Sequence, residues 1–263
     1  MALVVLAAAL ALAVPPANAP LPREPRELAA ALVRTEDALD TSVDRWLAAG
    51  GSATPEDVVL TALYEQRLYR LLGRKPALAG RTLPLIPPRL RPVVRDNVAA
   101  RSDLYRLSTP RPRKIRVGAA LPATRLLGFY REAERRFGVR WELLAAVNLV
   151  ESAFGRVRSS SAAGAQGPMQ FLPATWRRYG LGGNVHDPHD AILGAANYLR
   201  ANGARRDERS ALYGYNHSWL YVDAVRRYAA RIAADPRAYY AYHAWQVFVR
   251  TPSGERRVTG PRL

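Results

Sequence analysis

Four short segments between residues 151 and 221 carry the side chains whose types could do chemistry. Glu151 closes an apolar run that begins at Val139. Further on come Gly-Ala-Gln-Gly-Pro-Met-Gln-Phe at 164–171, Ala-Asn-Tyr-Leu at 196–199 and Tyr-Gly-Tyr-Asn-His-Ser at 213–218. A carboxylate held against apolar surface is disfavoured as an anion, so its pKa rises. Such a group carries a proton at neutral pH and can donate it to a leaving oxygen, as cleavage of a glycosidic bond requires.

A second carboxylate partner for Glu151 is hard to find. A glycosidase normally uses two carboxylates that flank the bond it breaks. The other acidic residues near the four segments occupy helix-capping positions, a charged turn, or the far end of the same helix: Asp187, Asp190, Asp207, Glu208 and Glu142. The residues alone therefore leave Glu151 without an evident second carboxylate.

Taken together and in this order, the segments resemble the lytic transglycosylases of the SLT, goose-lysozyme-like superfamily. The sequence Gly-Pro-Met-Gln-Phe-Leu-Pro-Ala-Thr-Trp at 167–176 is close to that of actinobacterial members. The resemblance covers about 120–235. It implies a mainly α fold with a lysozyme-like helical catalytic domain. It also implies an enzyme that cleaves the MurNAc-β-1,4-GlcNAc bond of peptidoglycan with a single Glu. In such enzymes the substrate's acetamido group stabilises the anomeric carbon and the muramic C6 hydroxyl attacks it, which leaves a 1,6-anhydro end.

The resemblance also assigns substrate-binding residues to this chain: Ser161, Gln170, Tyr215, Asn216 and Tyr221. Gln170 would reach the sugar, and the Tyr221 hydroxyl would lie near Glu151. The Asn216 side chain can offer both a donor and an acceptor to an acetamido group. Core packing is the alternative for the two tyrosines. Trp176 fits a core position as well as it fits a sugar-stacking platform.

No cofactor and no metal are expected. His186 and His189 have His-x-x-His spacing, but a zinc site needs a further strong ligand. The segment 180–187 lacks the acidic residues of the calcium-like loop that some relatives carry there. The sequence has no cysteine, which excludes a disulfide framework, a thiolate metal site and a lipid-anchor cysteine.

The net charge of +17 is spread along the 263 residues and calls for a polyanionic partner. Peptidoglycan glycan strands together with anionic wall polymers would suit it. A nucleic-acid-binding protein is the rival from another class, but no helix-turn-helix or aromatic RNA-binding signature is present, so no nucleic-acid partner is expected. A lysozyme-type hydrolase and a catalytically idle wall-binding protein are the further rivals.

The elements that must position these residues divide the chain into five parts. An apolar run at 2–14 followed by Ala17-Asn18-Ala19 predicts a signal peptide over 1–19, either cleaved or kept as an anchor, and hence an exported protein. No later run approaches membrane-spanning length. We expect an N-terminal region of three helices at 20–107 and a basic, proline-containing linker at 108–122. The lysozyme-like catalytic domain then covers 123–235, and an aromatic and basic tail with a small hairpin covers 236–263.

Overall fold

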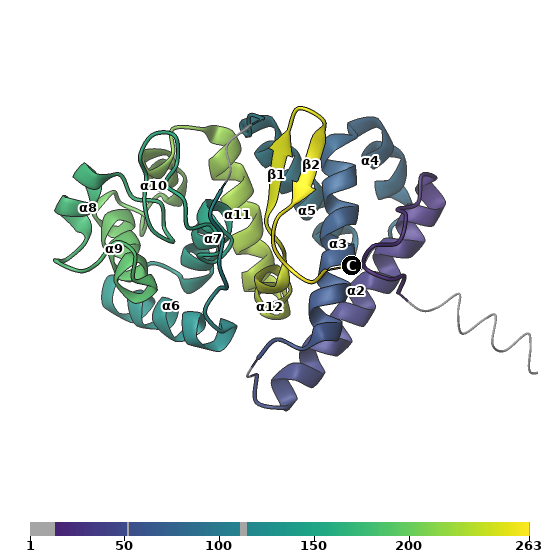
Figure 1. Cartoon of the computed structure of the whole chain (residues 1–263), viewed down its shortest axis with the longest axis horizontal. Helices are drawn as coiled ribbons and strands as arrows, with labels where there is room; N and C mark the ends of the chain where they lie inside the picture. The colour runs from purple at the N-terminus through teal and green to yellow at the C-terminus, as the bar shows by residue number, and fades with distance from the viewer. Residues whose placement is uncertain (1–13, 52, 111–114, 263) are drawn as a thin grey trace, which may run out of the picture.

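The computed structural model describes residues 14–51, 53–110 and 115–262 (Figure 1). Within these ranges it has eleven α-helices, one short 3-10 helix and one two-stranded antiparallel sheet. The prediction of a mainly α fold with a C-terminal hairpin is therefore confirmed. The apolar run of the predicted signal peptide, apart from its last residue, lies in 1–13, outside the described residues. The described end of that segment lies against the N-terminal helices, where Arg67 donates to the Ala17 carbonyl at 2.5 Å.

The N-terminal region contains more helix than the sequence predicted. Its elements are α2 (Pro25–Ala48), α3 (Glu56–Arg74), α4 (Pro76–Thr82), the 3-10 helix η1 (Leu83–Leu85) and α5 (Arg91–Leu107). The sequence predicted three helices here, whereas the structure has a further helix over 76–82 and a 3-10 helix over 83–85 between the second and the third. Pro76 occupies the first turn of α4, where its missing N–H and fixed φ cost nothing.

The second half of the chain is built from α6 to α12. Their bounds are α6 (Ala123–Phe137), α7 (Trp141–Ser152), α8 (Pro173–Tyr179), α9 (Pro188–Ala201), α10 (Glu208–Tyr215), α11 (Trp219–Ala234) and α12 (Arg237–Ala244). Asp187 caps α9 as predicted, because its carboxylate accepts from the backbone N–H groups of His189 and Asp190. Asp190 does not complete a capping box; its carboxylate accepts instead from the Asn184 N–H at 2.8 Å.

The tail contains a helix that the sequence did not predict, followed by the predicted hairpin. Helix α12 is rich in buried tyrosines, and the hairpin strands are β1 (Phe248–Thr251) and β2 (Gly254–Arg257). Tyr239 donates to the Ala123 carbonyl and Tyr242 donates to Asn97, each at 2.7 Å. Tertiary packing against distant parts of the chain therefore stabilises this eight-residue helix, which is too short to be stable on its own.

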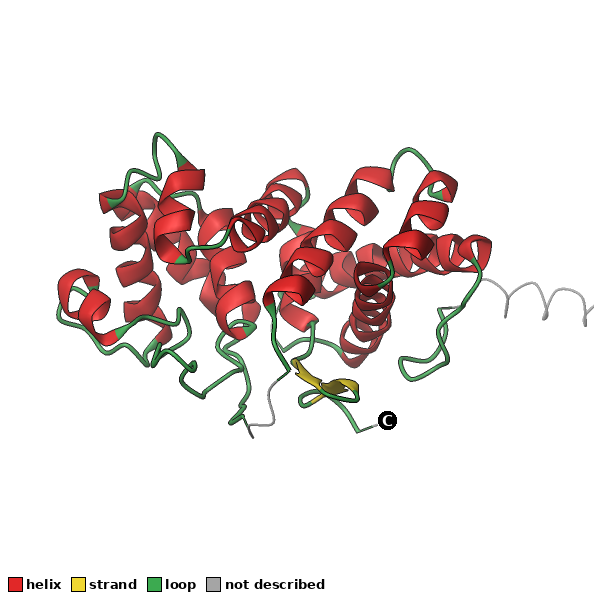
Figure 2. Cartoon of the chain, turned by 90° about the horizontal axis from the view of Figure 1, so that it is seen from above, coloured by secondary structure: helices red, strands yellow, loops and turns green. Residues whose placement is uncertain are grey.

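The two halves of the chain share one hydrophobic core. Figure 1 shows α2–α5 at one end, α6 and α8–α10 at the other, and α7, α11 and α12 between them. Helix α11 packs most extensively against α5, and α12 contacts both α2 and α3. Viewed from above, the hairpin and several long loops of the second half lie along the same side of the helices (Figure 2). The predicted division into an N-terminal helical region, a linker at 108–122 and a catalytic domain stays a prediction. Side-chain contacts nevertheless join the regions on either side of the linker.

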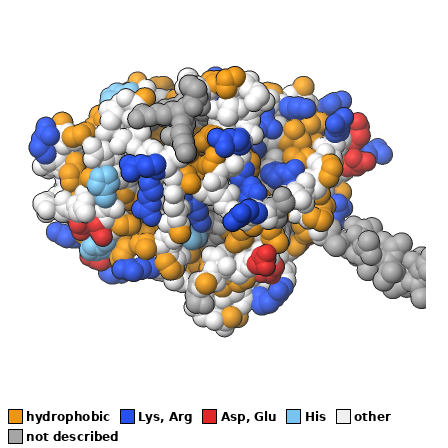
Figure 3. All heavy atoms as spheres, viewed as in Figure 1, with side chains coloured by type: hydrophobic (Ala, Val, Ile, Leu, Met, Phe, Trp, Pro, Cys, Tyr) orange, Lys and Arg blue, Asp and Glu red, His pale blue; other side chains and the backbone are white. Residues whose placement is uncertain are grey.

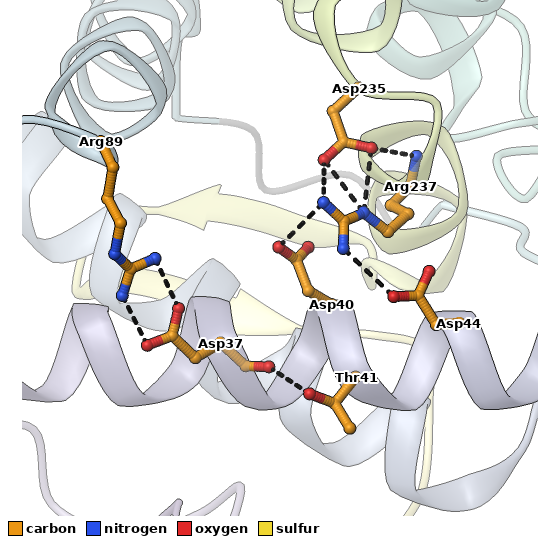
Figure 4. Close-up of polar contacts among 7 residues, drawn as sticks. All are labelled: Asp37, Asp40, Thr41, Asp44, Arg89, Asp235 and Arg237. Atoms are coloured by element: carbon orange, nitrogen blue, oxygen red, sulfur yellow. Dashed lines mark hydrogen bonds and ion pairs between the residues drawn. The ribbon is translucent and has the colours of Figure 1, made fainter.

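A cluster of ion pairs joins α12 to α2 (Figure 4). The Arg237 guanidinium lies among three carboxylates, those of Asp40, Asp44 and Asp235. Nearby, Arg89 makes a bidentate pair with Asp37 at 2.7 Å. Each exposed pair contributes only about 0–1 kcal/mol, and the Arg237 contacts with Asp40 and Asp44 are the ones that join α12 to α2. These acidic residues are locally concentrated, whereas Lys and Arg side chains spread over the face shown in Figure 3.

Over the described ranges, no helix is both long enough and apolar enough to cross a bilayer.

Candidate active site

Glu151 is half-buried in the last turn of α7. The rest of this helix is almost wholly apolar and buried, which carries the carboxyl group into the centre of the molecule. The helix ends there because Ala153 and Phe154 take left-handed φ angles of 51° and 61°, and Gly155 follows at 79°. A left-handed residue after the last turn is a common helix terminator. The chain therefore changes direction directly after Glu151, and the helix does not continue past its carboxyl group.

The Glu151 carboxyl group has a strongly altered acidity. Burial raises its pKa from the ordinary value of 4.5 to about 7, while a hydrogen bond from Tyr221 lowers it. The Tyr221 hydroxyl donates to Oε1 at 2.7 Å. A pKa near neutral lets Glu151 carry a proton and release it at neutral pH, so that the group can act as an acid and, once ionised, as a base.

The predicted groove floor at 164–171 is a tight loop held in shape by its own backbone. Gln166 and Phe171 exchange two backbone hydrogen bonds of 2.8 Å. Gly167 has a φ of 74°, and a Cβ there would lie 1.9 Å from the Val185 carbonyl oxygen, so only glycine fits. Gln170 takes a left-handed φ of 51°, and its side chain donates to the Gly167 carbonyl at 2.9 Å. The loop is therefore a rigid turn, and Gln170 helps to close it.

Two residues that the sequence analysis did not single out fasten this loop to the catalytic helix. Asn148 and Ser152 are each 1% exposed, and both donate to the Pro168 carbonyl, at 2.8 Å and 2.5 Å. Tyr130 in turn donates to the Asn148 side-chain oxygen at 2.6 Å, and Ser152 accepts from the Gly155 N–H at 2.8 Å. The one available signal was a polar Asn within an apolar helical run, four residues before a Ser.

One of the two predicted tyrosines contacts Glu151, and the other contacts the loop at 164–171. Tyr221 contacts Glu151 directly, as expected. Tyr215 donates to the Met169 carbonyl at 2.7 Å and so supports the loop from the other side. Burial raises the pKa of Tyr215 well above 10, and the negative charge of Glu151 raises it further. Both phenols are therefore neutral hydrogen-bond donors next to the carboxyl group.

The other predicted binding residues take different positions. Asn216 follows α10 in an extended conformation and is half-buried, and its side chain has no hydrogen bond to any described residue. Ser161 accepts from the Ala165 N–H at 3.0 Å, so it stabilises the loop rather than pairing with Glu151. Trp176 packs against Gly180 and Gly194, where an added Cβ would clash with its ring. That packing supports the core position for Trp176 over the sugar platform.

His186 and His189, whose spacing was considered for a metal site, do not form a common cluster. Instead, potential ligand atoms of Asp187, His189 and Asp190 lie within 4.8 Å of one another. All three are engaged already: the two carboxylates accept from backbone N–H groups, and His189 Nε2 lies 3.0 Å from Glu132. Hydrogen bonds at the start of α9 account for this arrangement without a metal ion, and the absence of a metal stays a prediction.

The geometry of this site agrees with comparisons to known proteins. Residues 129–244 match the family model of the Transglycosylase SLT domain, so the chain contains such a domain around Glu151. The resemblance found in the sequence is thereby confirmed at the level of the domain.

One curated relative is the "Membrane-bound lytic murein transglycosylase F" of Thiobacillus denitrificans. It is 31% identical over 118 residues, which cover 42% of this chain and 25% of the relative. The chain thus spans about a quarter of the length of the relative that it matches. No solved structure matches the chain.

Proposed function

We propose that this protein is a peptidoglycan lytic transglycosylase that cleaves the MurNAc-β-1,4-GlcNAc bond and leaves 1,6-anhydroMurNAc ends. One observation carries the proposal. A single half-buried carboxyl group with a pKa of about 7, hydrogen-bonded by Tyr221, ends the central helix of an SLT domain. A group of this acidity can give up and take back a proton at neutral pH without a second carboxylate.

The reaction then follows from one proton that leaves Glu151 and returns to it. Protonated Glu151 donates to the glycosidic oxygen as the bond from that oxygen to the anomeric carbon breaks. The substrate's acetamido oxygen stabilises the positive charge that develops on this carbon. The C6 hydroxyl of the same muramic residue then attacks the carbon and gives its proton to the Glu151 carboxylate, which restores the acid. No water is consumed.

The neighbouring side chains have roles that follow from their positions. Tyr221 donates to Glu151 and so stabilises the carboxylate formed after the first proton transfer. The free amide of Asn216 is available for the acetamido group of the sugar. Gln170, Ser161 and Tyr215 shape the loop on which the sugar would rest, through the contacts given above.

Export and wall association are part of the same proposal. The apolar N-terminal run followed by Ala-x-Ala supports export to the cell wall or the medium. The net charge of +17 supports attraction to anionic wall polymers as well as to glycan strands.

Product analysis tests this function. Purified sacculi are digested with the wild type and with Glu151→Gln, and the soluble fragments are analysed by mass spectrometry. We expect anhydro-ended muropeptides from the wild type and none from the variant. Reducing ends, heavier by one water, would identify a lysozyme-type hydrolase instead. No soluble fragment from a folded wild type would remove the enzymatic proposal.

A further inference from the structure

An open groove lies along the exposed side of helix α11, and its volume is about 380 Å³. It is lined by residues from α5, α10 and α11: Asp96, Arg209, Asp223, Arg226, Arg227 and Ala230. The buried face of α11 includes Tyr221, which donates to Glu151. Trp219 and Tyr221 are two residues apart and therefore point in opposite directions, about 200° apart around the helix. The groove next to Trp219 is thus separate from the proposed active site.

An exposed indole stands at the α10 end of this groove. Trp219 is 50% exposed, and its ring stacks on Tyr213 with the ring centroids 4.5 Å apart and an interplanar angle of 25°. The Arg209 guanidinium lies over the same indole, 5.1 Å from its centroid. Arg209 and Tyr213 are four residues apart, so they share one face of α10 and cover the same side of the indole. The exposed half of Trp219 is therefore its other flat side.

Trp219 is held in one orientation by its neighbours. A single apolar side chain on a surface is common and by itself needs no explanation. Here the indole is restricted by the stack on Tyr213 and by Arg209, which itself pairs with Asp223 at 3.2 Å. A rigid aromatic surface loses little conformational entropy when it binds a partner. Trp219 is therefore a preformed, flat apolar surface beside the groove.

The groove itself is polar, and most of its charges are paired. Its arginines and aspartates form three ion pairs: Arg209 with Asp223, Arg227 with Asp103, and Arg231 with Asp96. Arg226 is exposed, and within the described ranges no carboxylate pairs with it. Such a wall offers N–H donors and carboxylate acceptors side by side with only a small net charge. It matches a neutral ligand rich in hydroxyl and amide groups better than it matches a polyanion.

A sugar chain has the chemistry that these two features require. One flat side of a sugar ring carries C–H groups that can lie on an indole, and hydroxyl and acetamido groups at its rim donate and accept hydrogen bonds. A partner helix would instead need several apolar anchors at helical spacing. The residues that follow Trp219 at that spacing are Asp223, Arg226 and Ala230. From Trp219 to Ala230 the helix rises about 16 Å, which is longer than one sugar ring.

We infer that the exposed side of α11 is a second glycan-binding site, in which Trp219 stacks on a sugar ring and Arg209, Asp223 and Arg226 bind its polar groups. The inference rests on the proposed function for the identity of the glycan. Binding itself needs no cleavage, because Glu151 takes no part in it. A second contact with the same insoluble strand raises the effective concentration of substrate at the active site.

A fluorescence titration tests the site without turnover. Trp219 is the most exposed of the five tryptophans, since the others are buried or half-buried: Trp46, Trp141, Trp176 and Trp245. An N-acetylglucosamine oligomer added to the Glu151→Gln protein should shift the emission to shorter wavelength, and Trp219→Phe should remove the shift. A shift that persists in Trp219→Phe, the absence of any shift, or a response to polyglycerol phosphate alone would overturn the inference.

Activity on two substrates separates this site from the active site. The wild type and Trp219→Ala digest insoluble sacculi and a short soluble glycan fragment in high salt, which screens the net charge. We expect Trp219→Ala to lower the initial rate on sacculi about fivefold, as the loss of one aromatic contact implies, and on the fragment by less than about twofold. Leu85→Ala, at a side chain 46% exposed on η1, is the control and should change neither rate.

The outcomes distinguish this inference from the proposed function. An equal loss on both substrates would place Trp219 in the catalytic groove, and an unchanged rate on sacculi would mean that Trp219 holds no strand; either result contradicts a second site. If the oligomer binds through Trp219 while the wild type cleaves nothing, the proposed function fails and the glycan site stands.

Discussion

Replacing Glu151 by Gln should stabilise the folded protein at alkaline pH and not at acidic pH. The fold holds this carboxyl group where its charged form is poorly solvated, and burial raises its pKa to about 7. A Gln side chain has nearly the same shape, and its amide oxygen can still accept from Tyr221. Unlike the carboxyl group, however, it never ionises.

The magnitude follows from the difference between the folded and unfolded pKa. Below about pH 4.5 the group is protonated in both states and its raised pKa costs nothing. As the pH rises through 4.5 and up to about 7, the unfolded chain ionises first, and the fold loses stability progressively. At about 1.4 kcal/mol per pKa unit, the full loss is roughly 3 kcal/mol, reached above pH 8. Glu151→Gln escapes that loss.

Urea unfolding at pH 4.5 and at pH 8.5 measures this effect. The gain in free energy of unfolding for Glu151→Gln over the wild type should be about 3 kcal/mol larger at pH 8.5, with unchanged m-values. Glu142→Gln, at the start of the same helix, is the matched control; it should give no gain and lose about 0.3–1 kcal/mol of helix-dipole stabilisation. A gain for Glu151→Gln that is equal at both pH values would refute the account of a desolvated carboxyl group.

Three further changes test other contacts of the site. Tyr221→Phe removes a donor to the Glu151 carboxylate, so the alkaline limb of the pH profile of kcat/KM should move up by about one unit; a downward shift would contradict the proposed role. Gly167→Ala should cost more than about 3 kcal/mol in urea unfolding because its Cβ meets a backbone oxygen, whereas Gly164→Ala, with a similar φ but open space, should cost only about 1–2 kcal/mol. Asn148→Leu should lower the unfolding free energy by about 1–3 kcal/mol and raise KM, and an unchanged KM would show that the loop does not depend on this anchor.

Much of the fold was predictable because its signals are local. Helix periodicity, the Asp187 cap and the hairpin pattern depend on residues close together in the chain, and the structure bears them out. Helix α12 was not predictable, since its tyrosines gain stability from partners near residues 97 and 123. A helix of eight residues depends on tertiary contacts, and only the folded chain shows which contacts exist.

The same contrast between local signals and contacts formed on folding applies to the site. A carboxyl group at the end of an apolar helix predicts a raised pKa, and the Glu151 environment agrees. The anchoring of the loop by Asn148 and Ser152 was missed, because their acceptor on Pro168 becomes a neighbour only on folding.

A titration of Glu151 itself tests most directly the claim that one carboxyl group is the acid and the base. Protein labelled with ¹³C at the glutamate carboxyl carbons is followed by NMR from pH 4 to pH 9, and the Glu151 signal is assigned by its loss in Glu151→Gln. The account predicts a midpoint near 7, well above the ordinary value of 4.5. A midpoint close to 4.5 would mean that the group is ionised at neutral pH and cannot start the reaction as proposed.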